Sequence, residues 1–131
     1  MPCDYRIDSS RRLVITTASG AVSFEEIVAH QKRLQGDPEF VPEFDQLLDC
    51  RSATNLNVSS EQARLVAQRK LFSRTSKRAL VAGNPVVFGI GRMLQAYNEL
   101  APHGSVPRVF YDMKIALEWL HRTELLPVLV A

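Results

Sequence analysis

The chain has 131 residues, 46% of them hydrophobic and 23% charged, with a formal net charge of +2. This length and composition fit one globular domain over residues 1–131, and the charge is too near zero to indicate a nucleic-acid partner. The opening MPCDYRIDSSRR lacks the apolar core of a secretory leader, and the runs PVVFGI and LLPVLVA are too short to cross a bilayer core of ~30 Å. We therefore expect a cytoplasmic protein without a membrane span.

Two short alternating patterns open the chain. Apolar residues alternate within 5–7 and 13–17, on either side of the turn-forming DSSR, and predict a β-hairpin. The segment SFEEIVAHQKRLQG then predicts a helix, because Ser23 and Glu26 have the spacing of a capping box and Gly36 ends the apolar periodicity.

The middle of the chain predicts two buried strands with a helix between them. FDQLLDC and KRALVAG each have a short apolar centre bounded by polar residues or glycine. The helix between these strands is predicted from Ser59 to about Phe72, and Ser59 and Gln62 have the spacing of a second capping box.

The last part of the chain predicts helix, strand and helix. Asn84 is a capping residue and Pro85 suits the first position of a helix. PRVFYD predicts the last strand, and Asp112 caps the final helix. The predicted inward stripe of the third helix is Val86, Ile90, Met93, Leu94 and Tyr97.

This order predicts an α/β fold with one mixed five-stranded sheet, in which a β-hairpin is followed by βα units, covered by four helices. The charge-free tail at 125–131 should dock on its own sheet or helices, or on a second copy of the chain. Pro127 is expected to restrict this tail to an extended or edge segment.

Several phrases resemble the small bacterial STAS/SpoIIAA-like proteins, which have the fold of anti-sigma-factor antagonists. The phrases are YRIDSSRRLV, DPEFVPEFDQLLDCRSAT, KRALVAGNPVVFGIGRMLQAY and VFYDMKIALEWL. The resemblance implies the SpoIIAA-like fold. The family is also compared with lipid-binding CRAL-TRIO domains and has no established enzymatic activity.

The resemblance also implies a candidate phosphorylation site. In the antagonists, a partner kinase phosphorylates a serine in an Asp-Ser-Ser-Gly-like motif at a helix start, and the matching segment here is NVSSEQ. Ser59 and Ser60 are therefore candidate phospho-acceptors. However, Val58 or Asn57 replaces the acidic residue and Glu61 replaces the glycine, so helix capping is the favoured interpretation of Ser59.

The charges are segregated along the chain. Acidic residues are absent between Gln62 and Asn98, where a basic docking patch is a candidate. A solvated face is the alternative, and an acidic protein or an anionic head group would suit such a patch better than nucleic acid. The candidate patch residues are Arg64, Arg69, Lys70, Arg74, Lys77 and Arg78.

Recognisable catalytic and metal-binding motifs are absent from the sequence, so we expect no enzymatic activity, metal or cofactor. Cys50 ends an apolar run and is expected to be a buried free thiol. If a site exists, the crevice beyond the parallel strands is the expected place, since ligands bind there in open α/β sheets. The residues predicted to lie there are Asp49, Arg51, Asn84 and Tyr111.

Two hypotheses about function remain. The first is a non-catalytic regulatory or protein-interaction domain, whose partner is another protein or a second copy forming a homodimer. The alternative is a carrier or sensor of a small apolar or lipid-like ligand, held in a closed cavity. Gly89 and Gly91 of GIGR lie inside the third predicted helix, where they allow close packing or leave room for such a ligand.

Overall fold

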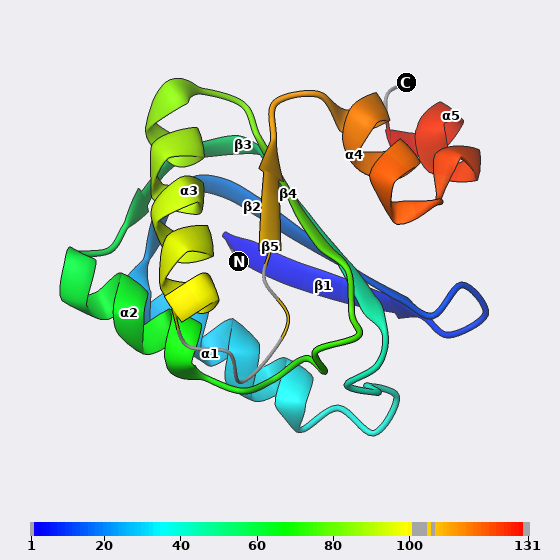
Figure 1. The fold of residues 1–131 in the computed structure, drawn as a ribbon, viewed down its shortest axis with the longest axis horizontal. Helices are drawn as coiled ribbons and strands as arrows, with labels where there is room; N and C mark the ends of the chain where they lie inside the picture. Colours follow the sequence, from blue (N-terminus) through cyan, green and yellow to red (C-terminus); the bar gives the residue numbers. More distant parts are fainter. Residues whose placement is uncertain (1, 101–104, 106, 130–131) are drawn as a thin grey trace.

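The computed structural model describes residues 2–100, 105 and 107–129, and its framework is a five-stranded sheet (Figure 1). The strands lie in the order β1-β2-β3-β4-β5. The β1–β2 pair is an antiparallel hairpin and the other pairs are parallel, which confirms the predicted mixed sheet. The strands are β1 Cys3–Asp8, β2 Leu13–Ser23, β3 Asp45–Asn57, β4 Arg78–Ala82 and β5 Pro107–Phe110.

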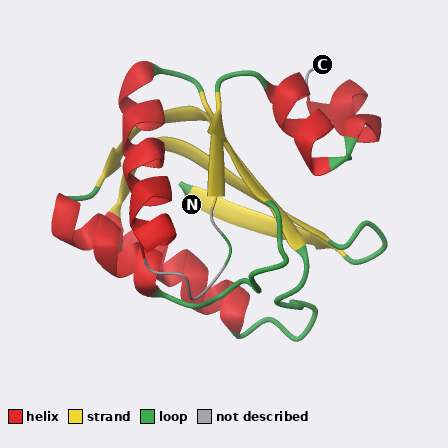
Figure 2. Ribbon diagram, viewed as in Figure 1, coloured by secondary structure: helices red, strands yellow, loops and turns green. Residues whose placement is uncertain are grey.

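The helices form two groups, with α1, α2 and α3 in one and α4 and α5 in the other (Figures 1 and 2). The four predicted helices are present, and a 3₁₀ turn and a short fifth helix follow them. The bounds are α1 Phe24–Gln35, α2 Ser60–Gln68, α3 Pro85–Leu100, α4 Met113–Leu120, η1 Thr123–Leu125 and α5 Leu126–Leu129.

Each face of the sheet has its own hydrophobic core because successive strand residues point to opposite faces. On the α4 face, Ile15 and Leu47 pack with Leu117. On the other face, Ala18 and Cys50 belong to a core that includes Val87 of α3. A side chain of α1 also packs against this core. No helix in the described part of the chain is both long and apolar enough to cross a membrane.

Two predicted boundaries are wrong. Strand β3 continues to Asn57 because its second half pairs with residues 19–23 of β2. Helix α2 ends at Gln68, where the backbone of Arg69 becomes extended. The chain then turns and buries Phe72 in a third core beside Phe44.

The predicted inward stripe of α3 is displaced by one residue at its start. Val86 is 56% exposed, whereas Val87 and Gly91 are buried. Gly91 faces the sheet because a Cβ there would lie 3.1 Å from a methyl carbon of Val109. The expected close packing is therefore confirmed at Gly91, while a Cβ at Gly89 would meet no heavy atom within 4 Å.

The described part of the apolar tail is helical and packs on α4. Leu125 is buried in the α4 core, and Leu129 packs against the same core. The expected extended conformation is wrong, because Pro127 lies in the first turn of α5, where a backbone N–H has no helical partner. Residues 130–131 lie outside the described residues, and docking on a second copy stays a prediction.

Candidate functional site

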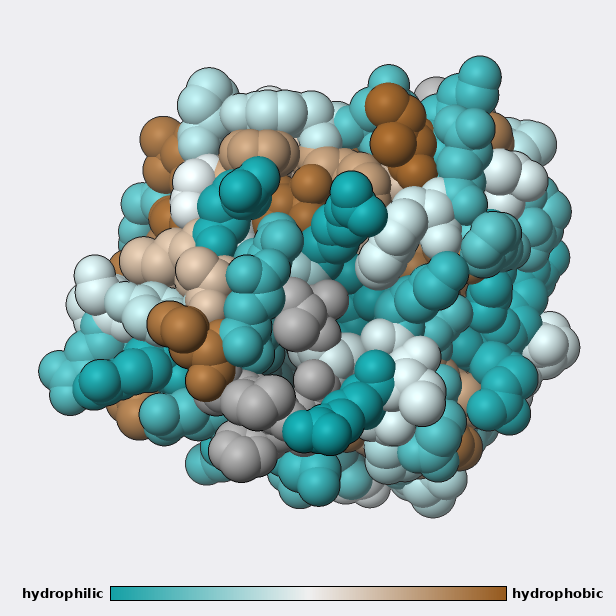
Figure 3. All heavy atoms as spheres, in the orientation of Figure 1, coloured by the Kyte–Doolittle hydropathy of each residue, from teal (hydrophilic) through white to brown (hydrophobic). Residues whose placement is uncertain are grey.

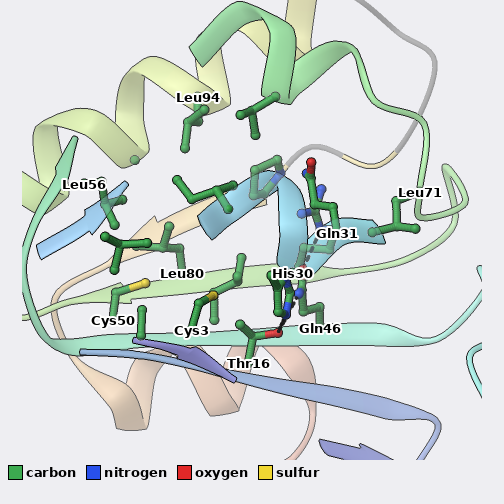
Figure 4. Close-up of a pocket in the computed structure, with 18 of the residues that line it drawn as sticks. Cys3, Thr16, His30, Gln31, Gln46, Cys50, Leu56, Leu71, Leu80 and Leu94 are labelled. Carbon is green, nitrogen blue, oxygen red and sulfur yellow. Dashed lines mark hydrogen bonds between the residues drawn. The ribbon is translucent and has the colours of Figure 1, made fainter. Parts of the chain in front are cut away.

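A cavity of about 100 Å³ lies between the sheet and the helices α1, α2 and α3 (Figure 4). The strand side chains that reach it include Thr16, Gln46 and Leu80, which come from three neighbouring strands. His30 and Gln31 reach it from α1, and Figure 4 shows them near Thr16 and Gln46 at one end. The cavity therefore has a polar end within an otherwise apolar core.

A chain of hydrogen bonds forms the polar end. The Nε of Arg78 donates to Oε1 of Gln46, and Nε2 of Gln46 donates to Oγ1 of Thr16, each over 2.9 Å. Thr16 Oγ1 also lies 3.1 Å from Nε2 of His30. The sheet register brings these hydrogen-bonding groups together, since Gln46 and Arg78 are cross-strand neighbours. Because Gln46 and Thr16 are buried, these bonds satisfy groups that water cannot reach.

Arg78 carries a positive charge into this core. Burial lowers its pKa to about 10, so the guanidinium remains protonated at neutral pH. Its planar end lies over the ring of Phe72, 4.8 Å from the ring centroid. No carboxylate of the described residues forms an ion pair with Arg78, whose guanidinium contacts the neutral amide of Gln46 and the ring of Phe72.

His30 is neutral at physiological pH. Burial is the largest cause that lowers its pKa to about 4, and the charges of Arg33 and Arg78 act in the same direction. The Tyr5 ring meets the imidazole edge-on at 5.5 Å. The adjacent Gln31 has a buried Oε1 without a hydrogen-bond partner in the described structure.

The other end of the cavity is apolar and contains the two cysteines, beside Leu56 and Leu80 (Figure 4). Both thiols are buried and free, which confirms the prediction for Cys50. Burial raises the pKa of Cys3 to about 11 and that of Cys50 to about 12. The thiols therefore stay protonated and are poor nucleophiles.

A second concave feature, the β5 groove, lies outside the sheet edge between α3 and α4. It measures about 570 Å³, and Arg92 of α3 and Arg108 of β5 are its charged lining residues. Figure 3 shows strongly hydrophilic side chains flanking hydrophobic ones on this face. The remaining lining residues are Gln95, Pro107, Val109, Phe110, Ile115 and Trp119.

Comparison with solved structures identifies the architecture. The chain superposes on an uncharacterised protein of the DUF3478 family with a SpoIIAA-like fold from Shewanella loihica PV-4, with a TM-score of 0.56 and 16% sequence identity. The match covers 90% of this chain and 91% of the other. The chain has a SpoIIAA-like fold. This confirms the predicted resemblance at the level of the fold, whereas no family model and no curated protein matches the sequence.

In this SpoIIAA-like fold, the two candidate phospho-serines lie at the start of α2. The Oγ of Ser59 accepts from the N–H of Gln62 over 3.1 Å, and Oε1 of Gln62 accepts from the N–H of Ser59 over 3.0 Å. The predicted capping box is therefore confirmed. Ser60 is the first residue of the helix and is exposed. Phosphorylation of either serine stays a prediction.

We expect the two serines to differ in their effect on stability. Ser59→Ala should lower the free energy of unfolding by ~1 kcal/mol, because it leaves the N–H of Gln62 without its acceptor. Ser60→Ala should change it by less than about 0.5 kcal/mol, since its side chain is exposed. Urea unfolding followed by circular dichroism measures both. Equal losses in the two variants would contradict the capping role of Ser59.

The predicted crevice residues are held by several different partners. Asp49 and Arg51 lie in the middle of β3 and form an ion pair, with Arg51 Nε 2.9 Å from Asp49 Oδ1. Arg51 also donates to the carbonyl of Leu129 over 2.6 Å. The side chain of Asn84 caps α3 and donates to Ala53 O over 3.0 Å, and Tyr111 stacks on Phe88 at 4.0 Å. Each of these side chains already has a structural partner.

The predicted basic patch is divided by the fold. Arg69 and Arg78 line the cavity, whereas Lys77 lies over the ring of Trp119 on α4. Lys77 and Arg78 separate because consecutive residues at a strand start point to opposite faces. The exposed members of the set are Arg64, Lys70 and Arg74.

The sequence carried a signal for the polar end of the cavity that the motif analysis missed. Gln46 is a lone amide in the apolar strand FDQLLDC, and Thr16 lies in the similar stretch LVITTAS. A polar residue on the buried face of a strand requires a buried partner. Of the histidines, His30 joins this cluster, His121 is exposed at the end of α4, and His103 lies outside the described residues.

Proposed function

We propose that this chain is a non-catalytic regulatory domain that binds an extended acidic segment of a protein partner in the β5 groove. The observation that carries the proposal is the position of β5 at the edge of the sheet, where β4 is its neighbour on one side. An edge strand presents unpaired backbone groups to which another strand can add.

The side chains of the groove support an acidic strand as the occupant. Arg92 and Arg108 line the groove, and no aspartate or glutamate lines it among the described residues. Phe110, Ile115 and Trp119 supply an apolar surface between α3 and α4 for alternate side chains of the added strand. Ile115 is 54% exposed, so this surface is accessible in the free chain.

Selection of extended peptides from a display library, followed by titration of the best binder, tests this function. The selected peptides should be acidic, and the amide signals that shift on binding should belong to β5 and its flanking helices. The double variant Arg92→Glu, Arg108→Glu should bind at least tenfold more weakly, because like charges would then face each other across the groove.

Arg64→Glu is the matched control, since this exposed arginine lies on α2 away from the lining residues of the groove. It should change the affinity by less than about twofold. Amide shifts centred on Ser59 and Ser60, or equal affinity of the double variant, would reject the groove as the binding surface.

A second candidate function, a carrier or sensor of a small ligand, is supported by the cavity beneath α1, α2 and α3. At about 100 Å³ this cavity is smaller than the ~300 Å³ or more typical of drug-sized ligand pockets. Its charged and amide-bearing end also differs from the lining expected for a purely apolar ligand. A sensor built on it would therefore bind a molecule of a few heavy atoms that carries a polar group.

A further inference from the structure

We propose that the cavity binds a short-chain monocarboxylate through Arg78, which deepens the second candidate function and rests on it. The Nε of Arg78 is used by Gln46, and its two Nη groups have no hydrogen-bond acceptor among the described residues. A guanidinium binds a carboxylate through two parallel hydrogen bonds. The cavity thus contains a donor group that matches this anion.

The charge balance of the cavity favours an anion. Arg69 lines the same space as Arg78, and none of the described lining residues is an aspartate or a glutamate. Arg78 is half-buried, and a partly desolvated cation without a counter-ion is disfavoured, so a carboxylate beside it would remove part of that cost. His30 is neutral, so it adds no charge.

The amide of Gln31 provides a further polar contact for the ligand. Its Oε1 is buried without a partner. Because the two ends of an amide have nearly the same shape, rotation of this group would present its NH₂ to a carboxylate. A ligand at the polar end of the cavity would give the unpaired amide of Gln31 a hydrogen-bond partner.

The apolar end limits the length of the ligand. Ala18, Leu56 and Leu80 line the cavity and belong to one apolar core. An engineered cavity of ~150 Å³ in another protein holds benzene, which has six heavy atoms, so a cavity of about 100 Å³ holds roughly four heavy atoms. Acetate and propionate are nearest to this size, with the alkyl part against the leucines and the carboxylate at Arg78.

Isothermal titration of the full chain with sodium acetate, propionate and octanoate and with propionamide tests the proposal. We expect propionate to bind at least tenfold more tightly than octanoate, which is too long, and than propionamide, which lacks the charge. Tighter binding of octanoate would overturn the short-chain assignment, and equal binding of propionamide would overturn the carboxylate assignment. Either result leaves a small-molecule sensor. If none of the four binds, both the assignment and the sensor function fail, and the β5 groove is unaffected.

A pair of variants tests the role of Arg78. Arg78→Met keeps the apolar stem and removes the charge, and it should weaken propionate binding at least tenfold. Arg64→Met, at an exposed position on α2, should change it by less than about twofold. Equal affinity of Arg78→Met and the parent chain would overturn the proposal.

A measurement on the unmodified protein keeps the test independent of how the variant folds. Nuclear Overhauser contacts should connect the propionate methyl group with the methyl groups of Ala18 and Leu56, because both residues line the cavity and belong to the same apolar core. Contacts confined to the exposed surface of the protein would overturn the proposal.

Discussion

Lowering the pH from 7 to 4 is expected to reduce the free energy of unfolding by about 3 kcal/mol through His30 alone. This histidine is 4% exposed, and burial is the main reason that its pKa falls from 6.5 to about 4. Between these two values the unfolded chain binds the proton that the folded chain excludes, so stability increases with pH across this interval. The stabilisation is complete above pH ~6.5 and is lost as the pH falls towards 4.

The neighbours of His30 explain why the folded protein resists its protonation. The charges of Arg33 and Arg78 lower its pKa further, and Asp4 opposes them with a smaller effect. Because Thr16 already accepts a hydrogen bond from Gln46, its hydroxyl hydrogen is available to the unprotonated Nε2 of His30. The hydrogen-bond chain therefore suits the neutral imidazole.

Urea unfolding at several pH values between 4 and 7 measures this effect. His30→Gln keeps a polar side chain near Thr16 and should lose most of the pH dependence within this interval. His121→Asn is the control, because His121 is exposed and has a left-handed backbone conformation that asparagine tolerates. An unchanged pH dependence in His30→Gln would show that His30 does not titrate as the structure indicates.

Gly83→Ala is expected to destabilise the fold by about 3 kcal/mol or more. Gly83 follows β4 and precedes the capping residue Asn84 of α3. A Cβ atom at this position would lie within van der Waals overlap of the backbone of Arg51, 2.9 Å from its carbonyl carbon and closer still to the oxygen. Both strands would have to shift, since neither backbone group can rotate away as a side chain does.

Gly89→Ala is the matched control within the next helix. A Cβ there meets no heavy atom within 4 Å, so alanine should stabilise α3 by ~0.5–1 kcal/mol through its helix propensity. Thermal and urea unfolding of the two variants measure the contrast. Similar stabilities of Gly83→Ala and Gly89→Ala would contradict the close approach of β3 at Gly83.

The two glycines show which features the local sequence predicts and which depend on the tertiary structure. Gly83 precedes the pattern that predicts a helix after Asn84, and Gly89 lies within that pattern. The sequence does not distinguish the environments of these two glycines. The backbone of β3 approaches Gly83 and leaves Gly89 free. Chain position alone cannot predict this difference, because the contact joins residues that are far apart in the sequence.

Local patterns in the sequence determined the order of the elements, the antiparallel hairpin and the capping boxes of α1 and α2. These features depend on residues a few positions apart, such as Ser59 and Gln62, and neighbouring backbone groups satisfy them. The resemblance of longer phrases then led to the SpoIIAA-like fold, which the structural comparison confirms.

The tertiary structure decided which side chains meet. It placed Arg78 beside Gln46 within a cavity, although its sequence neighbours suggested a surface patch. It also paired Asp49 with Arg51 in the middle of a strand that was expected to end near them. The physical reason is that burial depends on strand register and on the helix that covers each face, and both are fixed by contacts between distant parts of the chain.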